Sequence, residues 1–554
     1  MRLLALTAAL LLASCASAPV DPLEGCAVLK APIPASVIGL PTRGATIESA
    51  TLMAPIPMIV PARFPFQPPM TEITVIPATP EYCKVIGAIT PIDPKAPPIR
   101  FQVNLPTQWN GRSLQFGGGG FNGVLITGLG LAPSGHPDRP SPLARGFVTA
   151  GTDSGHQNAP GVALQAFALN DEALANFAHE AYKKVRDVSV DLMKRRYRKA
   201  PAKLYFFGSS EGGREGLTMA QRYPADFDGI YSRVPVINWA GLQVAGTRAG
   251  VAQFGEGWLA PDKVKLVHDA VLEACDLLDG LKDDIVADYE GCLRAFDVSK
   301  LRCTAGPTPG CLTEPQLKAV QTLHTPLEFR FSLANDVRTY PAWGRGGENA
   351  PGTGPVGGWP SWQAGEAPPT VPPGPKSSRA WLYGSGAIQY FVVRDPDYDP
   401  RRFNPEEFVG RLRQVSALMD STDPNLAAFA ARGGKLVIAE HMADYAQSPY
   451  AGIEYYKSVV ERMGQAKADE FLRLYVTPGA DHVGVGAPSS VDMIEVLTGW
   501  VERGQAPGEL AQAAHEVKPP YAVTATRPMC RYPAFPRYRE GDATKAESFE
   551  CARR

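Results

Sequence analysis

Residues 203–216 read KLYFFGSSEGGREG, and this stretch decides the fold class. Residues 203–208 are a short apolar run that predicts a buried strand, and residues 211–222 predict the helix that follows it. The turn between them, residues 208–212, fits the pattern G-x-S-x-G. A strand, a sharp turn and a helix in this order expose a serine hydroxyl at the edge of a parallel sheet. We therefore expect Ser210 to be a nucleophile.

The alternation of strands and helices continues on both sides of this stretch. Runs that predict strands lie at 99–103, 435–439 and 471–476, and residues 171–196 have the spacing of a long amphipathic helix. Such alternation predicts an α/β fold with a mostly parallel sheet covered by helices. A shorter apolar run at 58–60 also predicts a strand.

The middle of the chain breaks this pattern. Between Pro341 and Pro375, 18 of 35 residues are Gly or Pro, which excludes a strand or helix of the main sheet. The stretch is either an ordered loop pinned by Trp343, Trp359 and Trp362, or a mobile cover over a site. We therefore predict one catalytic domain, residues 26–235 and 426–554, interrupted by a lid domain at 236–425.

Composition excludes several classes of protein. The chain has 554 residues with Lys+Arg 55 and Asp+Glu 56, a net charge of -1. A nucleic-acid binder usually has a basic excess, so no nucleic-acid partner is expected. Hydrophobic residues make up 44%, enough for a sizeable core, and this excludes wholesale disorder.

The N-terminus resembles an export signal. Arg2 precedes an apolar run that is too short to span a membrane and ends at Leu12-Ala-Ser-Cys15. This pattern predicts a lipoprotein-type signal peptide at 1–15, lipidation of Cys15 and a tether at 16–25. The alternative is a plain secretory signal cleaved after Ala16 or Ala18. Either reading predicts export from a bacterial cytoplasm, to the outer membrane, the periplasm or the medium, with membrane contact only through a lipid anchor.

Eight cysteines remain after Cys15, an even number that suits disulfides in an oxidising compartment. Eight cysteines allow about 105 connectivities. Closure of short loops favours one set, with zinc as a weaker alternative because the chain has no CxxC pair. The expected bonds are Cys275–Cys292, Cys303–Cys311, Cys530–Cys551 and, by elimination, Cys26–Cys83.

A nucleophilic serine needs a base and an acid, in the chain order Ser, Asp or Glu, His. His482 follows the strand run at 471–476 and a Thr-Pro-Gly-Ala turn, which is the position of a catalytic base. His441 is a weaker second candidate. Asp444 closely follows the run at 435–439 and is the expected acid, whereas Asp481 adjoins the histidine and should point elsewhere.

Oxyanion donors are expected at two places. The backbone N–H of Glu211 opens the helix after Ser210. A second donor should come from the glycine turn at 117–123, GGGGFNG, where the backbone can approach a tetrahedral intermediate closely. A phosphate-binding loop is the alternative, but no G-K-[ST] follows it.

Together GGGGFNG, Gly151-Thr-Asp-Ser-Gly-His156, GSSEGGREG, an acidic loop at 276–285 and PGADH resemble the tannase and feruloyl esterase family, which includes hydrolases of mono(2-hydroxyethyl) terephthalate. The resemblance covers nearly the whole chain after residue 15. It implies an α/β-hydrolase fold with a large inserted lid domain. It also implies a Ser210–Asp444–His482 triad and oxyanion donation from Gly118 and Glu211.

Two positions depart from that family. Relatives usually have bonded cysteines just before the nucleophile and just after the catalytic histidine, where this chain has Ser209 and Val483. We expect the triad loops to be held by packing alone and the His482 loop to be more mobile.

The acidic loop reads DLLDGLKDDI at 276–285, with Asp at i, i+3 and i+7, a spacing that suits an oxygen-binding cation. A solvated acidic loop is the alternative reading. The resemblance implies one structural calcium ion; it places the ligands at Asp276, Asp279 and Asp283 and at the carbonyls of Leu281 and Ile285. Asp284 stands where the family usually has glycine.

The expected function is hydrolysis of carboxylic esters through an acyl-enzyme. By resemblance, the substrate is a small ester of an aromatic acid, as for a feruloyl esterase or tannase. Alternatives are a mono(2-hydroxyethyl) terephthalate-type hydrolase, an acyltransferase and a non-catalytic surface lipoprotein. Arg379 is a conceivable contact for a substrate carboxylate, but a solvated or structural arginine is the favoured interpretation. No obligate protein partner is expected.

Overall fold

The computed structural model describes residues 22–58, 77–351 and 357–554. Residues 1–15 with Cys15, and most of the run at 58–60, lie outside the described residues. The expected tether at 16–25 is wrong at its end, because α1 (Pro22–Ala27) already includes residues 22–25. The physical reason is Cys26, which is buried in α1 and disulfide-bonded to Cys83, so the fold begins earlier than the composition indicates.

Within the described residues, the core is one twisted sheet of eleven strands. Its centre is parallel, as predicted, from β5 through β4, β6, β7 and β10 to β11, and antiparallel strands extend both edges. In spatial order the strands are β1 (Ala45–Met53), β2 (Tyr82–Ile89), β3 (Ile99–Pro106), β5 (Val148–Thr152), β4 (Arg112–Phe116), β6 (Lys203–Ser209), β7 (Gly229–Arg233), β10 (Lys435–His441), β11 (Leu472–Thr477), β13 (Val523–Arg531) and β12 (Leu510–His515).

Helices cover both faces of this sheet because its central strands are apolar on both sides. On β6, Phe206 packs against one set of helices, whereas Tyr205 and Phe207 point to the opposite face. The first face is covered by α3 (Ala181–Tyr197), α4 (Glu211–Arg222) and α13 (Tyr450–Met463). The second is covered by α15 (Met493–Arg503).

The predicted helix at 171–196 is confirmed with one irregularity. It runs through α2 (Asp171–Ala175), a π-helical turn at Asn176–Glu180, and α3. Buried Asn176 lies in this π turn and accepts a hydrogen bond from the Lys184 ammonium, Nζ to Oδ1 2.9 Å. Widened turns of this kind occur where polar side chains must fit into a packed helix.

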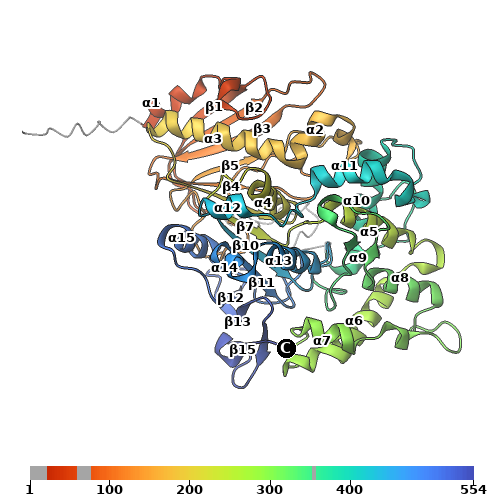
Figure 1. Ribbon diagram of the computed structural model, residues 1–554. Coiled ribbons are helices and arrows are strands. Elements are labelled where there is room, and N and C mark those ends of the chain that lie inside the picture. The colour runs from red at the N-terminus through yellow and green to blue at the C-terminus, as the bar shows by residue number, and fades with distance from the viewer. Residues whose placement is uncertain (1–21, 59–76, 352–356) are drawn as a thin grey trace, which may run out of the picture.

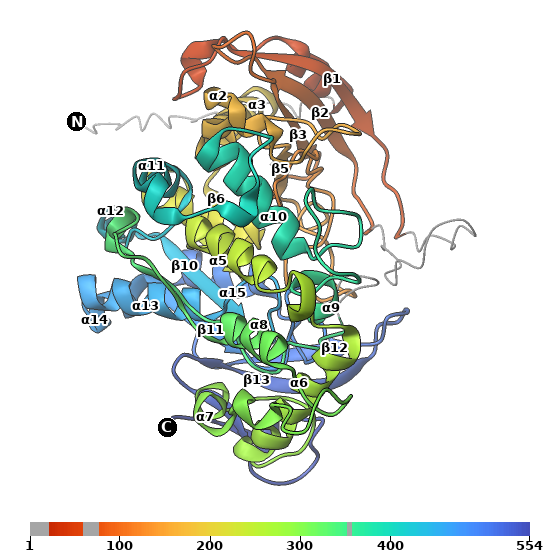
Figure 2. The same cartoon turned by 90° about the vertical axis from the view of Figure 1, so that its right-hand side faces the viewer.

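The chain between β7 and β10 forms the lid, which lies along one side of the sheet (Figures 1 and 2). It has its own apolar core, which joins that of the catalytic domain through Phe121 and Phe177. Its helices are α5 (Trp239–Val251), α6 (Pro261–Cys275), α7 (Tyr289–Ala295), α8 (Glu314–His324), α9 (Gly358–Trp362), α10 (Arg379–Ala387) and α11 (Val409–Met419), with α12 (Ala427–Ala431) leading into β10 and a two-stranded ribbon of β8 (Leu327–Glu328) and β9 (Thr339–Tyr340).

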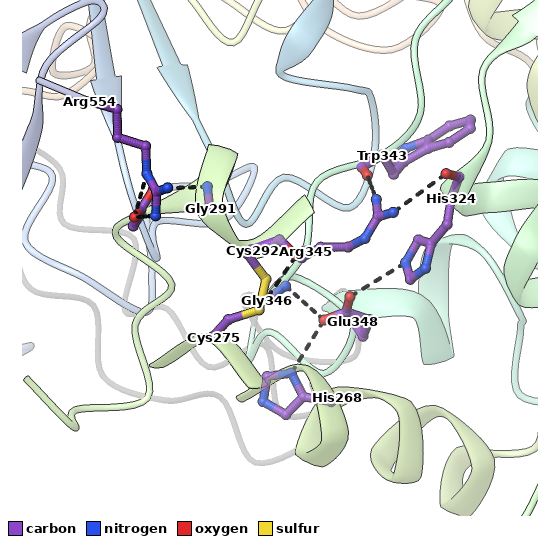
Figure 3. The surroundings of a disulfide bond; sticks show 11 residues. His268, Cys275, Gly291, Cys292, His324, Trp343, Arg345, Gly346, Glu348 and Arg554 are labelled. Atoms are coloured by element: carbon purple, nitrogen blue, oxygen red, sulfur yellow. Dashed lines mark hydrogen bonds and ion pairs between the residues drawn. A yellow bond between two sulfur atoms is a disulfide. The ribbon is translucent and has the colours of Figure 1, made fainter. Parts of the chain in front are cut away.

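The described part of the Gly/Pro-rich stretch is an ordered loop that includes the short helix α9. Trp343 and Trp359 are each 1% exposed in the lid core. Between them, the Glu348 carboxylate is fully buried and accepts the N–H of Gly346 at 2.9 Å. It also lies 3.5 Å from His268 Nδ1 and 3.6 Å from His324 Nε2 (Figure 3). The loop is therefore fastened to both α6 and α8.

The structure contains the four expected disulfides, Cys26–Cys83, Cys275–Cys292, Cys303–Cys311 and Cys530–Cys551. The second bond joins α6 to α7 beside the Glu348 cluster (Figure 3). The last ties β13 to the terminal hairpin of β14 (Phe535–Tyr538) and β15 (Phe549–Ala552). Within the described part of the chain, no helix has the length and apolar character needed to cross a membrane.

Candidate active site

Ser210 stands on a strained turn between β6 and α4. Its backbone has φ 61° and ψ −124°, a conformation that is costly for a residue with a side chain. The turn is possible because Gly208 and Gly212, two residues before and after Ser210, have no side chains: a Cβ on Gly208 would lie 1.9 Å from the Gly212 carbonyl oxygen. The strain holds the Ser210 hydroxyl out of the helix and directs it toward the lid side of the sheet.

Ser210, His482 and Asp444 are brought together in a hydrogen-bonded line. His482 Nε2 lies 3.0 Å from Ser210 Oγ, and His482 Nδ1 lies 2.7 Å from Asp444 Oδ2. Asp444 is 2% and His482 9% exposed. The Asp444 carboxylate accepts a hydrogen bond from the N–H at Nδ1, so the proton of the neutral imidazole stays on Nδ1. The lone pair of Nε2 then faces the serine hydroxyl. This is the arrangement that activates a serine.

Both partners of Ser210 are held by their own loops. The other oxygen of Asp444, Oδ1, accepts the N–H groups of Ala446 and Gln447 at 2.7 and 3.1 Å. One oxygen of Asp481 accepts the N–H groups of residues 483, 484 and 485 at 2.9–3.0 Å, and so shapes the turn that follows His482. Asp481 thus points away from the imidazole, as expected from the sequence.

His441, the second candidate base, does not contact Ser210. It is buried at the end of β10, where its Nδ1 donates to the Asp481 carbonyl oxygen at 2.7 Å. Burial and the nearby positive charge of Arg233 lower the pKa of His441 to about 3, so the ring is neutral at ordinary pH. Its place is beneath the His482 loop, which it supports.

One expected oxyanion donor is wrong in this structure. The Gly118 N–H donates to Glu215 Oε2 at 2.8 Å, so it points into the protein rather than toward Ser210. Its neighbour Gly119 lines the cavity beside Ser210 and Glu211. The glycine turn is nevertheless docked at the nucleophile, because the Gly212 N–H donates to the Gly118 carbonyl oxygen at 3.1 Å.

Behind the nucleophile, the first turn of α4 buries three charged side chains. The Arg214 guanidinium is fully buried and pairs with Glu211, Nη2 to Oε1 2.5 Å, while the Glu215 carboxylate accepts from Gly118 and Asn122. Burial raises the pKa of Glu211 and of Glu215, opposed by the charge of Arg214. These contacts hold α4 and the glycine turn in a fixed relation.

Sequence reasoning missed Arg233, the last residue of β7. Its carbonyl oxygen accepts the Ser210 N–H at 3.0 Å, and its Nε donates to Ser209 Oγ at 2.9 Å. A Cβ built on Gly484 would lie 3.3 Å from Arg233 Nη1, so the same guanidinium lies against the His482 loop. The packing between the two loops thus includes a charged side chain, which is hydrogen-bonded to the nucleophile turn and lies against the His482 loop.

A cavity of about 240 Å³ opens at Ser210 and His482. One wall comes from the lid and carries aromatic rings; the other comes from the glycine turn and the triad loops. Trp362 lies 5.9 Å from the His482 ring and 5.7 Å from the Tyr383 ring, measured between centroids. The lining residues are Gly119, Gly120, Phe121, Ser210, Glu211, Val236, Trp239, Leu242, Gln243, Trp362, Tyr383, Ala446, Gln447 and His482.

A larger cavity, about 770 Å³, lies elsewhere, between α13 and the C-terminal strands. Its lining includes Lys457, Glu461, Asp469 and Arg531, whereas Ser210 and His482 line the smaller one. Chemistry therefore favours the smaller cavity as the candidate active site, because it alone of the two places a nucleophile beside a base.

The acidic loop, 276–285, folds against the turn that precedes His482. Asp276 and Asp279 are 2% and 3% exposed, and burial together with Asp283 and Asp276 raises the pKa of Asp279 to about 7. Asp283 pairs with Arg527, Oδ2 to Nη2 2.5 Å, while its Oδ1 is buried without a hydrogen-bond partner among the described residues. A cavity of about 10 Å³ between Asp279, Asp283 and Ile285 also touches Pro478.

Comparison with known proteins gives consistent matches. The family model described as tannase and feruloyl esterase matches residues 83–552. An uncharacterized esterase of Agrobacterium fabrum is 35% identical over 95% of this chain and 92% of its own length. The mono(2-hydroxyethyl) terephthalate hydrolase of Piscinibacter sakaiensis is 33% identical over 86% and 85%. The structure of feruloyl esterase B from Aspergillus oryzae superposes with TM-score 0.75 at 24% identity, over 96% of this chain and all of that one.

Proposed function

The chain belongs to the tannase and feruloyl esterase family and is a carboxylic ester hydrolase with the α/β-hydrolase fold; from that premise we propose that it cleaves esters of aromatic acids through an acyl-enzyme on Ser210. The observation that carries the proposal is the unbroken line from Ser210 Oγ to His482 to Asp444, which opens into a cavity walled by aromatic rings. A non-catalytic surface lipoprotein would have no use for this arrangement.

In the proposed reaction Ser210 Oγ attacks the ester carbonyl while His482 Nε2 takes the hydroxyl proton. The backbone N–H of Glu211, at the N-terminus of α4, and that of Gly119 are the proposed donors to the oxyanion. His482 then gives its proton to the departing alcohol, and an acyl-Ser210 ester remains. A water molecule, deprotonated by His482, releases the acid and restores the serine.

Loss of the nucleophile or of its base tests this mechanism. Ser210→Ala and His482→Ala should each lower kcat for a p-nitrophenyl ester by at least about a thousandfold, with the circular dichroism spectrum unchanged. His441→Gln is the matched control and should retain most turnover. Activity that depends on His441 and survives loss of His482 would overturn the assignment of the base.

The aromatic wall supports an aromatic acyl group. Trp239, Trp362 and Tyr383 come from three lid helices and line the cavity opposite Ser210, so they offer a flat ring aromatic surface to pack against. Trp362→Ala should therefore raise KM for a feruloyl or terephthaloyl ester several-fold and leave KM for an acetyl ester nearly unchanged. An equal change for both esters would argue against an aromatic acyl site.

Arg379 supports a narrower substrate, an aromatic ester that also carries a free carboxylate, as in mono(2-hydroxyethyl) terephthalate. It opens α10, is half-buried, and its positive charge acts on Tyr383, which lines the cavity, and partly offsets the rise in the pKa of Tyr383 that burial causes. Comparison of that monoester with its methyl-capped diester tests this candidate: a preference for the monoester that disappears in Arg379→Gln supports it. Equal kcat/KM for the two esters excludes it.

We also propose one structural calcium ion in the acidic loop, held by carboxylates of Asp276, Asp279 and Asp283 and by the carbonyls of Leu281 and Ile285. The buried, unpartnered Oδ1 of Asp283 and the small adjoining cavity suit a hard cation. Bound there, calcium would offset the repulsion between the carboxylates. The loop also touches the turn before His482, since a Cβ on Gly479 would lie 2.8 Å from Ile285 Cγ2.

The calcium proposal is tested by metal analysis and melting. One calcium per chain and a Tm that falls in chelator are expected, and Asp279→Ala should lower Tm more than it lowers kcat at low temperature. Asp284→Asn, at an acid outside the proposed ligand set, is the control. Absence of calcium in the purified protein together with an unchanged Tm in chelator would remove the site.

Export to an oxidising compartment is supported by the four disulfides, and lipidation of Cys15 is proposed from the sequence. Radiolabelled palmitate should be incorporated by wild-type protein expressed in a bacterial host and not by Cys15→Ala. Label in neither protein, with both recovered from the periplasm, would favour simple cleavage of the signal.

A further inference from the structure

We propose a second metal site, for a divalent transition ion of the zinc type, formed by His136, Asp138 and His515. His136 and Asp138 lie in the long loop between β4 and β5, and His515 ends β12. One ligand atom from each side chain lies within 4.8 Å of the others. No step of the proposed ester hydrolysis uses these residues, and none of them lines the cavity at Ser210.

The two histidines face each other through ring nitrogens. His136 Nδ1 lies 2.8 Å from His515 Nε2, with the rings nearly perpendicular at 81°. Two zinc ligands in a tetrahedral site, each about 2.0–2.1 Å from the metal, stand roughly 3.3 Å apart. The rings need to separate by only about half an ångström to admit the ion, and all three side chains are at least partly exposed, which leaves room for a water ligand.

The hydrogen bonding of His515 prepares it as a ligand. Its Nδ1 lies 2.9 Å from the Tyr521 carbonyl oxygen, and because a carbonyl only accepts, Nδ1 carries the proton. In neutral His515 the Nε2 lone pair therefore points at His136. A metal-binding histidine is usually held in this way, with its far N–H donated to a carbonyl. Without metal, the His136 Nδ1–H fills the place of the ion; on binding, that proton moves to Nε2 of the same ring and no net proton is released.

The ligand set selects the class of metal. Two imidazoles and one carboxylate suit zinc and its transition-metal neighbours, whereas calcium prefers an all-oxygen shell. The proposed calcium loop and the His136 site are therefore chemically distinct and are loaded by different ions.

The position of the site indicates a structural role. Two residues before His136, the Ser134 carbonyl oxygen accepts the Val491 N–H at 2.7 Å. Ser490 pairs in turn with Ala513 of β12, two residues before His515. A metal held by His136 and His515 adds a third contact between these same segments. It would fasten the 132–138 loop and the segment after the His482 loop to the edge strand of the sheet.

Zinc binding to the whole protein tests the proposal. Protein without a polyhistidine tag is treated with chelator and returned to excess calcium, so that only the zinc-type site is empty, and is then titrated with zinc chloride. Calorimetry should find one site per chain in wild type. At a zinc concentration about a hundred times Kd, the unfolding equilibrium constant should fall about a hundredfold. Both effects should disappear in His136→Gln with His515→Gln and persist in Asp397→Asn, an exposed acid elsewhere.

Cobalt substitution makes the test independent of whether the variants fold. Wild-type protein loaded with cobalt(II) should show the visible bands of a four- or five-coordinate imidazole site, and one equivalent of zinc should bleach them. Absence of stoichiometric zinc and of these bands, or zinc binding that survives in the folded double variant, would overturn the proposal. Ester hydrolysis is not used as a readout, so failure here leaves the proposed function untouched.

Discussion

At the scale of single residues, a few backbone contacts fix the orientations of the Ser210 and Asp444 side chains, and the geometry of the proposed triad depends on them. Ser210 has positive φ in a turn that Gly208 and Gly212 make possible, and Asp444 is fixed by two backbone N–H groups on one oxygen. The other oxygen is thereby directed at His482 Nδ1. The acid thus sets the tautomer of the imidazole, and the backbone of the loop that follows β10 sets the orientation of the acid.

Replacement of Asp444 by asparagine should change the tautomer of the His482 imidazole while keeping the size and shape of the side chain at position 444. In Asp444→Asn the amide can donate to Nδ1, so Nε2 would carry the proton and lose its lone pair toward Ser210. We expect kcat to fall by about a thousandfold or more with an unchanged Tm. Steady-state hydrolysis of a p-nitrophenyl ester measures this, with Asp397→Asn, at an exposed acid that does not line the cavity, as the matched change. Near-normal kcat in Asp444→Asn would move the acid to another residue.

At the scale of elements, the candidate active site lies where the ends of β6, β7, β10 and β11 meet. Arg233, at the end of β7, holds the Ser209–Ser210 turn with both its carbonyl and its side chain, and its guanidinium contacts the loop after β11. One side chain thus links the nucleophile to the base loop, at the place where relatives are expected to carry a disulfide.

Loss of this link should affect turnover more than binding. Arg233→Met keeps the length of the side chain but removes its donors, and each net hydrogen bond contributes on the order of 1 kcal/mol. We therefore expect kcat to fall about three- to tenfold while KM changes little, because Arg233 does not line the cavity.

A covalent replacement is the positive control for Arg233→Met. In that background, Ser209→Cys with Val483→Cys should form a disulfide under oxidising conditions and restore most of kcat, and either single cysteine should not. Unchanged kcat in Arg233→Met itself would show that the bridge has no part in positioning the triad.

The loop that carries Trp343 and Trp359 is fastened by a buried Glu348 between two lid helices, which makes the lid sensitive to acid. Burial and the charge of Arg345 lower the pKa of His324 to about 4, below the usual value near 6.5. Between these values the unfolded chain binds a proton that the folded chain does not. The contribution of His324 to stability is therefore present above about pH 6.5 and is lost as the pH falls toward 4.

Removal of this histidine should flatten the pH dependence of folding. His324→Gln should reduce the slope of the unfolding free energy between pH 6.5 and pH 4 by up to about 1.4 kcal/mol per pH unit. Urea unfolding at several pH values measures the slope. Leu323→Ala, its buried neighbour on α8, should lower stability at every pH without changing the slope. An equal slope in wild type and His324→Gln would contradict the assignment.

At the scale of the whole molecule, the lid is a packed layer that supplies one wall of the candidate active site and whose core is continuous with that of the catalytic domain through Phe121 and Phe177. Its core centres on buried aromatic rings, and the chain terminus is fastened to it: the Arg554 guanidinium pairs with Asp288, the residue that caps α7. In Figure 1 the C-terminus accordingly lies beside α7. Stability of the lid and shape of the cavity are therefore linked.

Truncation of a lid tryptophan should loosen the packing of the lid and thereby change the cavity wall. Trp359 is 1% exposed and lies three residues before Trp362, which lines the cavity. Trp359→Ala leaves a cavity in the lid core and should lower the free energy of unfolding by about 3–5 kcal/mol. We expect faster proteolytic cleavage within 341–375 and a raised KM. Trp109→Ala, which removes a ring stacked on Tyr197 in the catalytic domain, is the control and should leave both unchanged. Equal protection of the loop in Trp359→Ala would contradict a lid core centred on this ring.

The sequence by itself determined the α/β alternation, the serine turn, the order of Ser210, Asp444 and His482, and the four disulfides. These depend on local patterns: apolar runs that end in turns, glycines at a sharp bend, and short loops between cysteines. Most of these patterns act within about twenty residues or constrain the chain order, and are therefore readable before folding; Cys26–Cys83, which spans 57 residues, followed only by elimination.

Only the tertiary structure decided which groups face one another across the chain. The Gly118 N–H is taken by Glu215, 97 residues away, so the glycine turn presents Gly119 to the cavity instead. Arg233 bridges two loops, and His136 meets His515 across 379 residues. Periodicity gives the face on which a side chain lies but not its partner, because the partner depends on how strands and loops pack in three dimensions. Hydrogen bonds and metal ligands need that partner within about 3 Å, and only the packed fold specifies distances of this size.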